Sequence, residues 1–175
     1  MRQRPRVGRE GGVSVEACCF TGHRVLPGGE RYLEVRRLTE AAIRDAYAAG
    51  CRRFFAGGAI GFDMLAAAIV CALRDSEYPD MTLHLLLPCR DQAERWSSRD
   101  RERYHAMLAA ADTYAYLTNE YHAGVMSLRN RALIDAADLC IAYMQNPASG
   151  TGGTLSMARK RGIAIRNIAD EIKMQ

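Results

Sequence analysis

The chain has 175 residues, of which 49% are hydrophobic and 25% charged, and its net charge is +4 at pH 7. This usage is typical of a globular protein, and the length suits a single domain with a sizeable core. No apolar run approaches the roughly 20 residues that span a bilayer, and no secretory hydrophobic region opens the chain, so we predict a cytoplasmic protein without a membrane partner.

The positive charge is carried by arginine, and part of it lies in residues 1–10. We interpret residues 1–14 as a flexible basic N-terminal arm and residues 15–175 as one domain. Elsewhere arginine alternates with Asp and Glu, as in residues 90–103, which is typical of a solvated helix face rather than a duplex-DNA surface. The six cysteines form no CxxC pair, and we expect them to be reduced.

Strands and helices are predicted to alternate along the chain. Short apolar runs that end in turn residues predict strands, and apolar residues at helical spacing predict helices. The predicted strands are 15–20, 53–56, 82–87 (stopped by Pro88), 113–117, 139–143 and 163–168. The predicted helices are 30–49, 62–74, 91–110 (with a break at Ser97-Ser98), 125–137 and 155–161. This alternation predicts an α/β, Rossmann-like, open and mostly parallel sheet with helices on both faces, in three layers.

Polar and Gly-rich clusters follow four of these strands. Because ligands of open parallel sheets bind beyond the carboxyl ends of the strands, near the point where strand order reverses, the clusters predict one cleft at that edge. The clusters are Thr21-Gly22-His23-Arg24 after the first strand, residues 57–63 after the second, Pro88-Cys89-Arg90 with Gln92 and Trp96 after the third, and residues 149–154 after the fifth.

The run after the fifth strand gives the clearest chemical signal. We interpret Ser149–Thr154 as a loop in which glycines let the backbone approach a ligand, followed by a helix whose first N–H groups suit a phosphate. The predicted contacts are Gly150, Thr151, Gly152, Gly153 and Thr154. A tight connection without a ligand is the alternative, since neither GxxxxGK[ST] nor GxGxxG is matched.

The remaining turns suggest further contacts. Gly57 and Gly58, together with Thr21 and Gly22, are interpreted as a second binding position for phosphate or ribose. Asp63 either complements a helix dipole, or binds ribose hydroxyls or acts as a general acid/base.

The basic side chains near the predicted cleft have separate interpretations. Arg24 suits a bidentate contact with phosphate, while His23 either packs in its turn or acts in catalysis. On the helix before the fifth strand, Arg129 is the better candidate to reach the cleft. Arg131 is explained by a surface pair with Asp135.

Other kinds of site receive little support from the sequence. Trp96 is interpreted as a core anchor, with base stacking as the alternative. His84, His105 and His122 lack the spacing of metal ligands, and no GxSxG elbow is present. We therefore expect no metal and no required cofactor, beyond a bound nucleotide.

The motifs resemble those of the YpsA-like branch of the SLOG superfamily. They are FTGHR at 20–24, GGAIGFD at 57–63, Pro88…Gln92…Trp96, RNR at 129–131, AD at 137–138 and GTGGT at 150–154. The superfamily is Rossmann-like and includes the LOG phosphoribohydrolases and the DprA DNA-processing proteins. The resemblance implies a site for a nucleotide or nucleotide-derived ligand at Gly57, Gly58, Asp63, Arg129, Gly152, Gly153 and Thr154.

One position departs from the LOG pattern. Aligning that pattern places Arg129 on its arginine, Asn130 on its lysine and Gly153-Thr154 on its GT pair, so that Met157 stands where LOG enzymes carry the catalytic Glu. Three functions therefore stay open: a sensor or binding domain for an ADP-ribose- or NAD-like ligand, a hydrolase that uses Asp63, or a DprA-like single-stranded DNA-binding protein. The sequence leaves open whether the chain forms a homo-oligomer.

Overall fold

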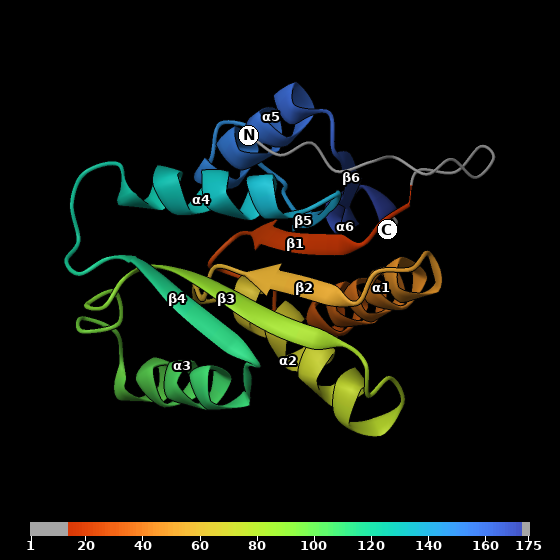
Figure 1. The fold of residues 1–175 in the computed structure, drawn as a ribbon, viewed down its shortest axis with the longest axis horizontal. Helices are drawn as coiled ribbons and strands as arrows, with labels where there is room; N and C mark the ends of the chain where they lie inside the picture. The colour runs from red at the N-terminus through yellow and green to blue at the C-terminus, as the bar shows by residue number, and fades with distance from the viewer. Residues whose placement is uncertain (1–13, 173–175) are drawn as a thin grey trace, which may run out of the picture.

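The computed structural model describes residues 14–172 (Figure 1). Apart from Ser14, the predicted basic arm lies outside this range. Within it, no helix is both long enough and apolar enough to cross a bilayer. The elements in chain order are β1 (Ala17–Gly22), α1 (Gly29–Ala48), β2 (Arg53–Ala56), α2 (Phe62–Ser76), β3 (Thr82–Cys89), α3 (Ser98–Ala110), β4 (Thr113–Thr118), α4 (Val125–Ala136), β5 (Leu139–Tyr143), α5 (Gly150–Arg161), β6 (Ala164–Asn167) and α6 (Ile168–Glu171).

The strands form one six-stranded sheet in the order β4-β3-β2-β1-β5-β6. Every neighbouring pair is parallel, which confirms the predicted Rossmann-like α/β fold. The chain first builds outward from β1 to β4 and then returns to β5, on the other side of β1. The strand order therefore reverses between β1 and β5, and their carboxyl ends are where this fold class binds ligands.

Helices cover both faces of the sheet (Figure 1). One core contains side chains of α1, α2, α3 and α6, packed on Phe20, Phe54 and Leu83 of the sheet. A smaller core on the opposite face joins α4 and α5 to Cys19 and Cys140. All six cysteines are free thiols. The two cores fix β1 and β5 from both sides, so the carboxyl ends of these strands form a rigid base for a site.

Two predicted boundaries around β3 are wrong. β3 continues through Pro88 to Cys89 instead of stopping at Pro88. Because β2 pairs with β3 only as far as Leu85, the missing N–H of Pro88 removes no hydrogen bond to β2. The next helix begins at Ser98 rather than at residue 91, since the Ser97 side chain caps it by accepting a hydrogen bond from the Asp100 amide. Residues 91–95 form turns.

The predicted loop before the last long helix is also corrected. α5 begins at Gly150, so the glycines and threonines of GTGGT belong to its first turns. Ser149 stands at the N-cap, and its hydroxyl accepts a hydrogen bond from the Gly152 amide at 3.2 Å. Gly162 ends the helix in the left-handed conformation (φ 75°), which favours glycine. The last strand is shorter than predicted, because Asn167 caps α6 directly after it.

Candidate functional site

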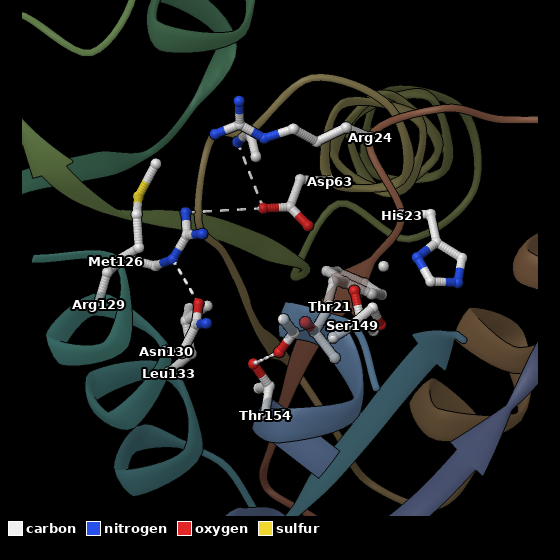
Figure 2. A pocket seen from close by; sticks show the side chains of 15 residues that line it. Thr21, His23, Arg24, Asp63, Met126, Arg129, Asn130, Leu133, Ser149 and Thr154 are labelled. Atoms are coloured by element: carbon white, nitrogen blue, oxygen red, sulfur yellow. Dashed lines mark hydrogen bonds and ion pairs between the residues drawn. The ribbon is translucent and has the colours of Figure 1, made fainter. Parts of the chain in front are cut away.

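A cleft of about 290 Å³ lies at the carboxyl ends of the strands, beside the reversal point (Figure 2). Its walls come from the end of β1, the turn before α2, one face of α4 and the start of α5. The lining residues are Phe20, Thr21, Gly22, His23, Arg24, Ala59, Asp63, Met126, Arg129, Asn130, Leu133, Ser149, Gly150, Thr151 and Thr154.

Close packing of glycines fixes the first wall. A Cβ at Gly22 would lie 2.4 Å from Phe62, so α2 can approach the end of β1 only because this residue is glycine. Gly61 has φ 87°, and a Cβ there would meet the carbonyl oxygens of His23 and Arg24. The Phe62 amide donates to the His23 carbonyl at 3.1 Å. The turns after β1 and β2 are therefore locked together, which places Asp63 against the cleft.

Arg129 reaches the cleft from α4, on the same helix face as Met126, Asn130 and Leu133. It is 7% exposed. Its Nη1 donates to the Gly57 carbonyl at 2.6 Å, and its Nε donates to Asn130 Oδ1 at 2.8 Å. Among the described residues Nη2 has no hydrogen-bond partner. A buried, oriented guanidinium thus keeps one donor group available on the cleft wall.

Asp63 lies beside this guanidinium without a direct hydrogen bond to it. Its Oδ2 is 3.9 Å from Arg129 Nη1 and accepts from the Ala59 amide at 3.3 Å. Burial raises the pKa of the carboxyl above its ordinary value, opposed by Arg129 and by backbone amides. Burial likewise lowers the pKa of Arg129, opposed by Asp63. Asp63 and Arg129 therefore form a buried ion pair without a direct hydrogen bond, and the desolvation of both charges opposes their attraction.

The start of α5 forms the facing wall. The amides of Gly152 and Gly153 are bound by Ser149, through its hydroxyl and its carbonyl. The first helical amides, at Gly150 and Thr151, have no intrahelical acceptor, and both residues line the cleft. The Thr154 hydroxyl donates to the Gly150 carbonyl at 3.1 Å. This wall therefore offers free N–H groups and the positive end of a helix dipole.

The remaining basic side chains differ in role. Arg24 is exposed at the cleft and makes no ion pair within the described residues. His23 Nε2 accepts a hydrogen bond from the Gln145 amide at 2.8 Å, which leaves the proton of the neutral ring on Nδ1. The ring also packs edge-on against Tyr143. His23 therefore ties the ends of β1 and β5 together, as in the packing interpretation. Figure 2 shows Arg24 reaching toward Asp63 and Arg129.

The cleft does not collect every predicted contact. Gly57, Gly58, Gly152 and Gly153 are outside its lining. A Cβ at Gly57 would lie 2.2 Å from Arg129 Nη1, and one at Gly152 would lie 1.9 Å from the Pro147 carbonyl oxygen. These two glycines admit protein atoms rather than a ligand. Gly58 (φ 72°) abuts Leu87, while Gly153 faces open space.

Three further interpretations are settled by contacts. The polar residues after β3, at 88–96, were predicted to line the cleft but do not. The Gln92 side chain donates to the Gly58 carbonyl instead. The predicted Arg131–Asp135 pair is wrong, because Asp135 pairs with Arg161 at 3.1 Å. Trp96 packs edge-on against Tyr104, at the margin of the core, as the anchor interpretation predicted.

Several lining residues were not among the predicted contacts. Met126, Asn130 and Leu133 lie three residues before, one after and four after Arg129, so helical spacing from that arginine could have identified them. Ser149 was visible as an N-cap residue before a glycine run. Met157, at the position of the LOG glutamate, is not among the lining residues.

Comparison with known proteins found a matching family model and similar proteins of bacteria. Residues 30–162 match the family model described as the YspA SLOG family. A UPF0398 protein of Halalkalibacterium halodurans is 28% identical over 130 residues, covering 73% of this chain and 68% of the relative. The UPF0398 protein YpsA of Bacillus subtilis is 30% identical over 107 residues, covering 59% of each. The matched segment is thus about three fifths to two thirds of these relatives.

Two solved structures share the fold. DNA processing protein A of Helicobacter pylori, studied for its single-stranded DNA binding mode, superposes with a TM-score of 0.61 at 16% identity, covering 89% of this chain and 70% of that one. DNA processing protein A of Streptococcus pneumoniae gives a TM-score of 0.57 at 14% identity, covering 86% and 49%.

Proposed function

The chain belongs to the YspA SLOG family, and from that premise we propose that its cleft binds a nucleotide or a nucleotide-derived ligand, of the ADP-ribose or NAD kind, through phosphate. The protein acts as a binding or sensor domain for this ligand.

The observation that carries the proposal is the state of Arg129. Its guanidinium is buried and oriented by two hydrogen bonds, while Nη2 remains free on the cleft wall. Burying a charged donor is costly unless it is paired, and Asp63 is 3.9 Å away from it. A phosphate oxygen would complete the pairing with a charge-assisted hydrogen bond.

The opposite wall supports the same ligand chemistry. The free amides of Gly150 and Thr151 at the start of α5 suit an anion, and Arg24 adds a second positive charge at the cleft mouth. Met126 and Leu133 contribute an apolar surface on α4 that suits a sugar or base. The volume of about 290 Å³ is at the lower end of ligand sites, roughly 300–1,000 Å³, so it suits one nucleotide unit.

A thermal-shift panel tests the proposal, with AMP, ADP-ribose, NAD, cyclic nucleotides and a short single-stranded oligonucleotide as probes. Ligand at about a hundred times its Kd adds roughly 2.7 kcal/mol of stability, which raises the Tm by about 5 to 11 °C for a domain of this size. Arg129→Ala should remove the shift, whereas Arg131→Ala, an exposed arginine on the same helix, should keep it. An equal shift in both variants contradicts the proposal.

A hydrolase is the alternative function, and the buried position of Asp63 in the cleft favours it. Because burial raises the pKa of this carboxyl, Asp63 is a candidate proton donor to a leaving group. In this case the ligand would be cleaved at an N-glycosidic or phosphate bond, and Asp63→Asn would abolish product formation. Intact ligand after prolonged incubation with the wild-type protein rules this function out.

A third candidate is single-stranded DNA binding, suggested by the DNA processing protein A folds. Affinity for the oligonucleotide would then fall steeply with salt. A response to the oligonucleotide alone, without any response to the small nucleotides, would favour it over the proposed function.

A further inference from the structure

One edge of the sheet is β4, whose outer side pairs with no strand among residues 14–172. Figure 1 shows it as the outermost strand, beyond β3. The first three of its six residues, TYAYLT, are exposed, and Tyr114 is 51% exposed. The backbone N–H and C=O groups on the outer side of an edge strand can pair with a strand of another chain.

The two edges of the sheet differ in their protection against such pairing. Natural edge strands are kept short, covered by other elements, or marked with charged residues or proline. The other edge, β6, has four residues, carries Arg166 and continues directly into α6. Arg166 forms ion pairs with Asp45 and Glu171. β4 is longer and contains neither a charged residue nor a proline, so its edge remains open to a partner strand.

The hydrogen bonds between β4 and β3 determine which backbone groups face outward. Just before β4, the Asp112 amide donates to the Leu83 carbonyl at 2.9 Å. Since the backbone of a strand repeats every two residues, the even-numbered residues of β4 also face β3. The odd-numbered residues therefore present their N–H and C=O groups away from the sheet: Thr113, Ala115 and Leu117.

We propose that β4 pairs with β4 of a second copy of this chain, antiparallel and across a two-fold axis at Ala115. Ala115 then lies opposite Ala115 of the second copy, and Thr113 lies opposite Leu117. Each of these is a hydrogen-bonded pair that exchanges two N–H···O bonds, so every outward group of the odd-numbered residues is used. The two six-stranded sheets join into one. This pairing does not depend on the ligand of the cleft.

The side chains of β4 suit this two-fold axis. The sequence around Ala115 is symmetric, Tyr-Ala-Tyr, so Tyr114 of each copy lies opposite Tyr116 of the other. Within one chain the two rings pack edge-on with centroids 5.8 Å apart, and Arg90 lies over the Tyr116 ring at 4.7 Å. The dimer gathers two tyrosines from each copy, and aromatic pairs directly across antiparallel strands are stabilising. It also covers the exposed ring of Tyr114.

The charges beside the two ends of the strand are complementary in this register. Thr118 lies opposite Asp112 of the second copy, and its neighbour on β3 is Cys89. The next residue, Arg90, is exposed, so the pairing brings it toward that aspartate, which also pairs with Arg74 of its own chain. Opposite charges thus approach at both ends, while no like charges face each other along the strand. This match favours a second copy over an unrelated strand.

Sedimentation equilibrium of the full chain tests the proposal. At micromolar concentration the wild type should have twice the chain mass of 19.4 kDa. Ala115→Lys should be monomeric, because two lysines would lie directly opposite each other at the axis. The matched control is Ala164→Lys, which changes an exposed alanine on the other edge strand and should stay dimeric. Thermal melts of both variants show whether each is folded.

A cysteine variant tests the register even if Ala115→Lys does not fold. The Cα atoms of a hydrogen-bonded antiparallel pair are about 5.5 Å apart, which a disulfide can span. Under mild oxidation Ala115→Cys should therefore form a disulfide-linked dimer, whereas Leu33→Cys, exposed on α1, should not. A monomeric wild type overturns the proposal, as does a dimer that persists in folded Ala115→Lys. An assembly larger than a dimer overturns the closed two-fold pairing.

Discussion

Substituting Gly57 by alanine tests whether this residue acts through Arg129, although it does not line the cleft. The added Cβ would lie 2.2 Å from Arg129 Nη1 and 2.7 Å from its Cζ. The guanidinium ends a flexible side chain, so we expect it, rather than the backbone, to move away. That movement breaks the 2.6 Å hydrogen bond to the Gly57 carbonyl and reorients the free Nη2 donor.

The size of both effects follows from the lost contacts. A hydrogen bond to a charged group contributes about 1.5–3 kcal/mol. For a domain of this size the Tm should fall by roughly 3 to 12 °C, at about 2–4 °C per kcal/mol. If Nη2 loses a comparable bond to phosphate, the Kd for the nucleotide should rise by roughly ten- to a hundredfold, at about 1.4 kcal/mol per factor of ten.

Calorimetric titration and thermal melting of Gly57→Ala measure the two effects separately. The reasoning is refuted if Gly57→Ala binds nucleotide as tightly as the wild type, even with a lowered Tm. In that case the position of Arg129 would have no bearing on the ligand.

Three other predictions concern the start of α5 and Asp63. The Cβ added by Gly153→Ala meets nothing within 4 Å. This variant should therefore raise the free energy of unfolding in urea by about 1 kcal/mol and leave nucleotide affinity unchanged. A weaker affinity would show that Gly153 contacts the ligand. Ser149→Ala should lower the free energy of unfolding by about 1 kcal/mol, because the N-cap is lost. Ser149→Asp should keep that stability but weaken nucleotide binding, because its carboxylate repels a phosphate. Tight nucleotide binding by the aspartate variant would argue against a phosphate at the start of α5. Because burial raises the folded pKa of Asp63 above the unfolded value, its favourable contribution is complete below about pH 3.8 and is lost as pH rises through the folded pKa. Asp63→Asn should therefore gain stability relative to the wild type as the pH rises above about 3.8, and unfolding free energies that differ by the same amount at every pH would show the pKa to be unshifted.

Much of the fold could be predicted because its signals are local. The strands Arg53–Ala56 and Leu139–Tyr143 are short apolar runs between turns, and their bounds match the prediction. The start of α5 was less visible, since its first five residues are all Gly or Thr, which disfavour a helix by propensity. The Ser149 cap and the close approach of Gly152 to Pro147 stabilise that first turn, and the second of these is a tertiary contact.

The contacts within the site depend on residues far apart in the sequence. Gly57 was predicted to approach a ligand, but it approaches Arg129, 72 residues later, which α4 brings back across the sheet. The exclusion of one predicted polar turn from the cleft follows from strand order. β1 and β5 are neighbours, while β3 is two strands away from β1, so the turn after β3 does not line the cleft. Periodicity gives no information on that order.

The central claim is that phosphate binds between Arg129 and the start of α5, and amide NMR tests it most directly. Adding nucleotide to uniformly ¹⁵N-labelled protein should move the amide proton signals of Gly150 and Thr151 downfield, because these N–H groups become hydrogen-bonded to an anion. The amide of Gly162, at the far end of the same helix, should not move. Shifts confined to other regions, or none at Gly150 and Thr151 at saturating nucleotide, would contradict the proposed site.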